Sequence, residues 1–122
     1  MSRKFAIAVI DDDESFRLAL VGSLRSLDYD ARGFASVEEF IAGSGDKSSD
    51  CVITDLHMPG MSGLDLIRQL KAGGSTLPAI MVTGRPEPGL EAKAAAGGAV
   101  CLLRKPFETD SLIDCLEKAL KP

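Results

Sequence analysis

Polar residues follow four short apolar runs, and this arrangement limits the fold more than any other feature of the chain. The runs cover residues 5–10, 51–54, 79–82 and 100–103, and the polar residues after them are Asp11 and Asp12, Asp55, Thr83, and Lys105. A short apolar run that ends in a functional group is typical of a buried parallel strand at its carboxyl end. Ligands of open α/β sheets bind at that edge, so we expect these distant residues to meet in one site.

Helical patterns alternate with the apolar runs. Residues 15–27 place leucines and Phe16 at helical spacing, and Ser36–Glu39 matches the capping box that opens a short helix. Further helices are predicted around Leu64–Leu70, over 90–96, and from a start within 106–110. A weak strand over 31–35 is expected at a sheet edge, where low apolarity is tolerated. Residues 43–50 are predicted to form a polar loop.

Five such strand–helix units predict the α/β class, as a single (βα)5 doubly wound parallel sheet. A chain of 122 residues is one domain, so we expect one domain over 1–122. The three cysteines, Cys51, Cys101 and Cys115, have no CxxC spacing and no nearby histidine, and we expect free, buried, reduced thiols.

Charge and hydropathy exclude several classes of function. The net charge is −4 and the basic residues are dispersed, which argues against direct contact with nucleic acid. No apolar stretch approaches the roughly 20 residues that cross a bilayer. The basic start at residues 1–4 is followed by too short an apolar run for a signal peptide. We therefore expect no membrane contact and a cytoplasmic location.

Metal-assisted phosphoryl chemistry explains the polar set best. Asp11, Asp12 and Asp55 repel one another when gathered, unless a hard divalent cation such as Mg²⁺ lies among them. Asp55 is the candidate nucleophile, because a carboxylate can attack phosphorus to form an acyl phosphate. Thr83 supplies a hydroxyl and Lys105 a positive charge that can pair with phosphate. The structural alternative is a solvated acidic cap over residues 11–14 and a turn-capping role for Asp55.

The four motifs that carry these residues resemble those of the receiver domain of two-component response regulators. They are Val9–Asp12, Ile53–Leu64, Met81–Gly84 and Arg104–Phe107. The spacings also resemble the family's: 43 residues separate Asp12 from Asp55, 28 lead on to Thr83, and 22 more lead to Lys105. The ordered set is far more specific than any one motif, and the resemblance covers essentially the whole chain.

The resemblance implies a flavodoxin-like fold with strand order 2-1-3-4-5 and a cis Lys105–Pro106 bond. It implies that Asp55 accepts a phosphoryl group from a phosphohistidine on a sensor histidine kinase or a histidine phosphotransfer domain. Asp12, Asp55 and the backbone carbonyl of His57 would bind Mg²⁺, with Asp11 assisting. Thr83 and Lys105 would bind the phosphoryl oxygens. Such receivers often catalyse their own phosphorylation and dephosphorylation, without being conventional enzymes.

Two features depart from the family's pattern. Leu102 stands where the family commonly has Tyr or Phe, so the usual aromatic readout of phosphorylation is in doubt. Residues 85–89 are rich in Pro and Gly, and we expect them to shorten the fourth helix of the (βα)5 pattern and lengthen the loop beside the site. The side chain of His57 is expected to face water. Phosphoryl capture should survive both departures.

Several alternatives remain open from the sequence. The main one is a receiver-like protein–protein interaction module that works without phosphorylation. A metal-dependent hydrolase is weaker, because the sequence offers no additional general base. The chain fits a stand-alone receiver, or equally part of a longer regulator with a C-terminal output domain, and a homodimer through the last helices is open. The kinase and the regulated process are not encoded in these motifs.

Overall fold

Five parallel strands form one sheet, as the sequence pattern predicts, in the order β2-β1-β3-β4-β5 that the family resemblance implies. The computed structural model describes residues 4–43, 45–85 and 87–120. The strands are β1 Ala6–Ile10, β2 Asp30–Phe34, β3 Cys51–Asp55, β4 Ala79–Thr83 and β5 Cys101–Arg104. Among the described residues, the helices are α1 Glu14–Ser26, α2 Val37–Ala42, α3 Gly45–Ser48, α4 Gly63–Ala72, α5 Leu90–Gly97 and α6 Thr109–Leu120.

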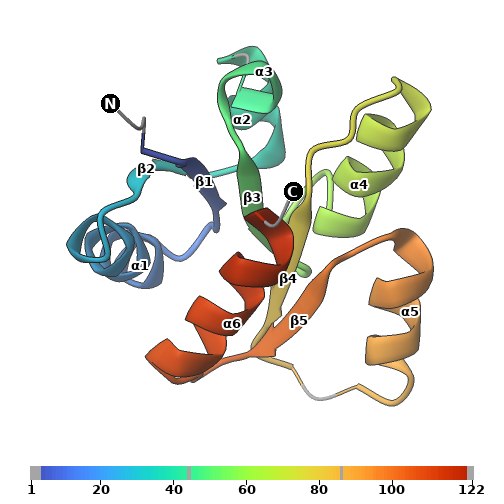
Figure 1. The fold of residues 1–122 in the computed structure, drawn as a ribbon. Helices are drawn as coiled ribbons and strands as arrows, with labels where there is room; N and C mark the ends of the chain where they lie inside the picture. Colours follow the sequence, from blue (N-terminus) through green and yellow to red (C-terminus); the bar gives the residue numbers. More distant parts are fainter. Residues whose placement is uncertain (1–3, 44, 86, 121–122) are drawn as a thin grey trace.

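Helices cover both faces of this sheet (Figure 1). One core cluster joins α1 and α6 to the sheet through residues such as Leu24, Ile53 and Leu116. The second joins α2, α4 and α5 to the opposite face, through residues such as Phe40, Leu66 and Met81. Every residue of β3 and β4 is buried, because these strands lie inside the sheet with helices on both sides.

The edge strand β2 is the least apolar one, as expected for residues 31–35. Its sequence is Asp-Ala-Arg-Gly-Phe, and only Ala31 in it is buried. The strand ends differ from the predicted ones by one or two residues. Asp55 and Thr83 are the last residues of β3 and β4, and do not follow them. Both functional groups are therefore held by strand hydrogen bonding.

Backbone hydrogen bonds continue past the strands at the residues that carry function. The amide of Asp11 donates to the Phe34 carbonyl at 3.1 Å, and that of Lys105 donates to the Thr83 carbonyl at 2.8 Å. The amide of Leu56 donates to the Val82 carbonyl, also at 2.8 Å. These bonds fix the backbone at three points of the sheet's carboxyl edge. The fixed backbone in turn positions the functional side chains.

Two local predictions need correction. The predicted loop 43–50 contains one helical turn, α3, which propensity does not reveal because Gly45 and Ser48 are poor helix formers. At the start of α2, Ser36 caps the Glu39 amide as predicted, but the Glu39 carboxylate accepts from the amide of Ala35. The reciprocal capping box occurs instead at Ser62 and Asp65, where it opens α4.

Three other local expectations are confirmed. Helix α5 starts at Leu90, after Gly89 in a left-handed conformation, and spans only 8 residues. The Lys105–Pro106 bond is cis. All three cysteines are free, although Cys101 is only partly buried. Burial raises the pKa of the Cys51 thiol to about 12, so this thiol stays protonated at neutral pH.

The close approach of α4 to the end of β3 requires glycine at position 63. A Cβ at Gly63 would lie 2.7 Å from the Asp55 carbonyl oxygen, whereas a Cβ at Gly22 in α1 would meet nothing within 4 Å. We expect Gly63→Ala to lower the free energy of unfolding by about 1–3 kcal/mol through overpacking.

The matched Gly22→Ala variant should raise the free energy of unfolding by about 0.5–1 kcal/mol, because alanine favours the helix. Urea denaturation of both variants measures these changes. Equal effects at the two positions would contradict the proposed close approach.

Candidate functional site

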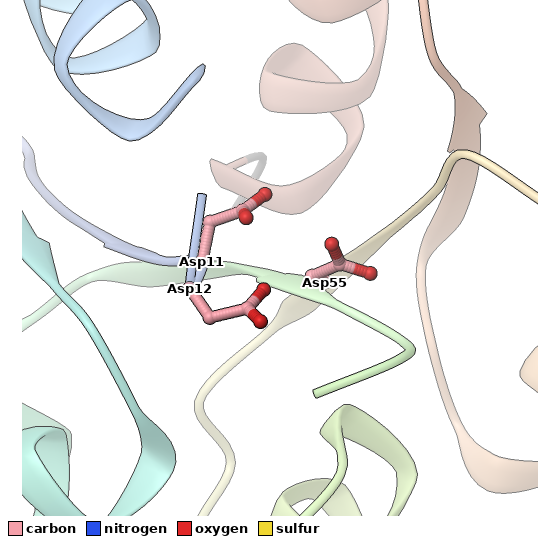
Figure 2. A group of neighbouring side chains, drawn as sticks. All are labelled: Asp11, Asp12 and Asp55. Atoms are coloured by element: carbon pink, nitrogen blue, oxygen red, sulfur yellow. The ribbon is translucent and has the colours of Figure 1, made fainter. Parts of the chain in front are cut away.

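Three carboxylates meet at the carboxyl edge of the sheet (Figure 2). Asp11 and Asp12 follow β1, and Asp55 ends the neighbouring strand β3. One oxygen from each residue lies within 4.8 Å of the others. Asp11 and Asp55 are buried, and Asp12 is exposed. Two desolvated carboxylates side by side are unfavourable unless positive charge compensates them.

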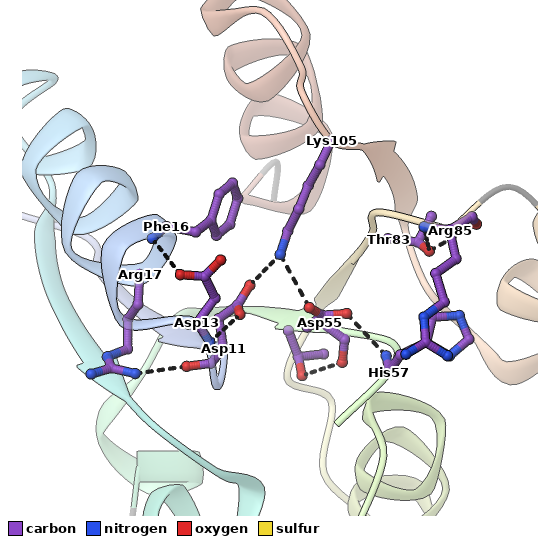
Figure 3. Close-up of polar contacts among 10 residues, drawn as sticks. Asp11, Asp13, Phe16, Arg17, Asp55, His57, Thr83, Arg85 and Lys105 are labelled. Carbon is purple, nitrogen blue, oxygen red and sulfur yellow. Dashed lines mark hydrogen bonds and ion pairs between the residues drawn. The ribbon is translucent and has the colours of Figure 1, made fainter. Parts of the chain in front are cut away.

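The ammonium of Lys105 supplies that positive charge. Its Nζ donates to Asp11 Oδ2 at 2.8 Å and to Asp55 Oδ2 at 3.1 Å (Figure 3). The Lys105 side chain is only 20% exposed, so these ion pairs are shielded from water. The three carboxylates and this single ammonium together carry a net charge of −2. A divalent cation would neutralise that charge.

Backbone amides hold the other oxygen of the two buried carboxylates. The Asp13 amide donates to Asp11 Oδ1 and the His57 amide donates to Asp55 Oδ1, each at 2.9 Å. Both carboxylates thus receive one amide and one ammonium hydrogen bond. The guanidinium of Arg17 holds the same turn from behind, donating to the Asp11 carbonyl oxygen at 2.8 Å. The result is a preorganised, oxygen-rich site.

The hydroxyl of Thr83 is turned toward its own loop. Thr83 Oγ1 donates to the Arg85 carbonyl and accepts from the Arg85 amide, both at 3.1 Å. In the sheet register Asp55 pairs with Val82, so Thr83 lies one residue beyond the level of Asp55 on the neighbouring strand. The sheet therefore brings Asp11, Asp55 and Lys105 into contact, places Asp12 beside them, and leaves the Thr83 hydroxyl bonded to Arg85.

The expectation that the His57 side chain faces water is wrong. Its Nε2 is buried and lies 3.2 Å from Glu87 Oε1, without a hydrogen-bond geometry. This contact joins the loop after β3 to the loop after β4. An open depression of about 430 Å³ adjoins the acidic cluster, and its lining includes Asp12, His57 and Arg85. The acidic cluster is therefore open to a molecule that approaches from this side.

Two contacts of the site do not follow from the sequence pattern. One is the approach of Glu87 to His57, and the other is the ring of Phe16, whose centroid lies 4.0 Å from Lys105 Nζ. Phe16 fits the apolar face of its helix, so its spacing predicts core packing and hides a second contact. Glu87 lies in an irregular loop, where no periodicity indicates direction.

Lys105 has a raised pKa. Burial alone would lower it, but the hydrogen bonds to Asp11 and Asp55 and their charges outweigh burial. A group whose pKa is higher in the folded state stabilises the fold below its unfolded pKa, near 10.4 for lysine. This contribution disappears as the pH rises through the folded value.

We therefore expect Lys105→Met to be less stable than the original protein by about 1–3 kcal/mol at pH 7, since two buried carboxylates lose their partner. The difference should stay constant up to about pH 10 and shrink above it. Urea denaturation between pH 7 and 11.5 measures it.

Lys4→Met is the control, because Lys4 pairs with Asp28 at the surface, where ion pairs contribute little. A Lys105→Met deficit that stays unchanged through pH 11.5 would be inconsistent with the ion pairs as its source.

The geometry agrees with comparisons to known proteins. A family model described as the response regulator receiver domain matches residues 7–117. The transcriptional regulatory protein FixJ of Bradyrhizobium diazoefficiens is 36% identical over 99% of this chain and 59% of its own length. The response regulator protein TodT of Pseudomonas putida is 35% identical over 98% of this chain and 52% of its own.

Solved structures show the same fold. The crystal structure of FixJ-N superposes with a TM-score of 0.88 at 31% identity, covering 98% of this chain and 96% of that one. A response regulator receiver protein from Burkholderia phymatum has a TM-score of 0.83 at 36% identity, covering 96% and 95%. The chain spans just over half the length of the curated relatives named above. It belongs to the family of response regulator receiver domains.

Proposed function

We propose that the chain, as one domain over 1–122, is a phosphoacceptor and that Asp55 takes up the phosphoryl group. The observation that carries the proposal is the Lys105 ammonium between Asp11 and Asp55, with Asp12 in the same cluster. The donor is a phosphohistidine on a sensor histidine kinase or a histidine phosphotransfer domain. Family membership supports this donor class.

The residues present fit Mg²⁺. The cluster offers only oxygen ligands, and the oxygens lie within 4.8 Å of one another. Two oxygens on one Mg²⁺ are at most about 4.2 Å apart, since each Mg–O distance is about 2.1 Å, so carboxylate oxygens 4.8 Å apart would have to approach one another by at least about 0.6 Å to bind one ion. Asp11, Asp12, Asp55 and the carbonyl of His57 would hold the ion. When bound, Mg²⁺ supplies charge neutralisation between the carboxylates and the incoming phosphoryl group.

The proposed reaction is an in-line displacement at phosphorus. A carboxylate oxygen of Asp55 forms the new O–P bond, and the P–N bond to the donor imidazole breaks, so the bonding pair leaves with the imidazole nitrogen. The Lys105 ammonium already donates to Asp55 and can then pair with the oxygens of the transferred phosphoryl group. No proton has to leave Asp55, because the attacking group is a carboxylate.

Thr83 would complete the change of state. Its hydroxyl exchanges the Arg85 backbone for a phosphoryl oxygen, which moves the loop after β4. Two charge-assisted hydrogen bonds, from Thr83 and Lys105, contribute roughly 1.5–3 kcal/mol each. Shifting an equilibrium from 1:99 to 99:1 requires about 5.5 kcal/mol. Together the two bonds contribute roughly 3–6 kcal/mol, so only the upper end of this range reaches the required shift, and only when both bonds form solely in the phosphorylated state.

The output is a protein surface that changes with phosphorylation. Curated relatives are about twice as long as the matched region and carry names such as transcriptional regulatory protein, which supports an output domain in a longer regulator. Leu102 is partly buried and packs against the core cluster that includes α5, and its side chain has no ring that could turn inward on phosphorylation. Transmission would depend on the α5 loop more than on this position.

Incubation with Mg²⁺ and acetyl phosphate tests the proposal. We expect a single phosphoryl adduct by intact mass spectrometry, and no adduct in Asp55→Asn. Asp13→Asn is the matched control, because asparagine also caps helix α1 and the acidic cluster keeps all three carboxylates.

Absence of any adduct in the original protein would instead favour an interaction module that works without phosphorylation. An adduct that persists in Asp55→Asn would place the chemistry on another residue.

A second experiment addresses the switch. Thr83→Ala should still form the adduct but lose about 1.5–3 kcal/mol of the preference for the active state. Thr83→Ser, which keeps the hydroxyl, should retain most of it. Amide chemical-shift changes of the non-proline residues Gly84, Arg85, Glu87, Gly89 and Leu90 on adding beryllium fluoride measure the shift in population. Identical spectra for the two variants would refute the role of the hydroxyl.

A further inference from the structure

Phe16 lies in the first turn of α1, and contacts of both its backbone and its ring fix its position. Its amide donates to Asp13 Oδ1 at 3.2 Å in the helix cap. The ring meets Phe107 edge to face, with 5.9 Å between centroids and an interplanar angle of 79°. Phe107 lies just before α6, so residues from the starts of two helices orient one ring. Edge-to-face pairs of this kind are favourable for aromatic side chains.

The face of this ring lies against the ammonium of Lys105. Nζ is 4.0 Å from the ring centroid, well inside the roughly 6 Å over which a cation and a ring attract. Figure 3 shows the ring and the two carboxylates around the end of the lysine side chain. Asp11 and Asp55 use two of the three ammonium hydrogens, and the ring covers another side of the group.

The chemistry of the ring matters here, beyond its volume. An aliphatic side chain would shield the ammonium from water without attracting it, and this desolvation disfavours the charged form. The negative face of an aromatic ring shields the ammonium and attracts it at the same time. Phe16 can therefore hold the charge near Asp55 without supplying a competing carboxylate.

We propose that Phe16 is a positioning residue, whose ring holds the Lys105 ammonium against Asp55 for phosphoryl capture. The inference rests on the proposed function of Asp55. It concerns an interaction that helix periodicity would assign to core packing alone. Since attraction of this kind is modest at partly exposed sites, we expect a change of about two- to fivefold in the rate constant of phosphorylation.

Fluorinated phenylalanines at position 16 test the ring's charge distribution with almost no change of shape. Each added fluorine weakens the negative face, so the rate of adduct formation with acetyl phosphate and Mg²⁺ should fall stepwise. Phe16→Leu should show the full decrease, and Phe16→Tyr should restore the rate. Phe5→Leu is the control, because Phe5 is 45% exposed and precedes β1, at the opposite end of the sheet.

A spectroscopic measurement separates this inference from the proposed function. In the unphosphorylated protein, the ε-methylene protons of Lys105 should be shifted upfield by the ring and lose that shift in Phe16→Leu. An adduct that forms at one rate across the fluorinated series would overturn the role of Phe16 and leave Asp55 as acceptor. A missing ring-current shift would overturn it too. Failure of the original protein to form any adduct would overturn the proposed function itself.

Discussion

The contact between one ammonium and two buried carboxylates is the interaction on which the site depends. Asp11 and Asp55 are brought together by adjacent strands, and their negative charges would separate them without Lys105. Lysine is suited to this position because its ammonium is a compact charge with donors that can be shared between partners. The arrangement keeps the acidic edge folded and leaves excess negative charge available for a cation.

The same contact links folding to function. Its three charged partners come from β1, β3 and the end of β5, so the pocket exists only when the whole sheet has formed. Backbone bonds at Asp11, Leu56 and Lys105 extend the sheet to its functional edge. In contrast, the Thr83 hydroxyl is bonded to a loop. The proposed switch therefore combines a rigid capture site with one group that can change partner.

Much of the fold could be predicted from the sequence, because parallel strands that are buried on both faces appear as short apolar runs. The apolar runs predicted the strands within one or two residues, and the Pro- and Gly-rich residues 85–89 predicted the short α5. The turn α3 could not be predicted, because Gly45 and Ser48 are poor helix formers. Residues that follow strands were expected to meet, and the four charged ones do meet. Side-chain directions were less predictable: periodicity explains Phe16 by the core alone, and nothing local directs His57 to Glu87.

Locating the phosphoryl group on the chain tests the central claim most directly. Borohydride reduces an acyl phosphate of aspartate to homoserine, and tandem mass spectrometry then identifies the modified residue. After treatment with acetyl phosphate and Mg²⁺, the account predicts homoserine at position 55 and at no other aspartate. Homoserine at position 11 or 12, or a phosphoryl group resistant to borohydride, would contradict it.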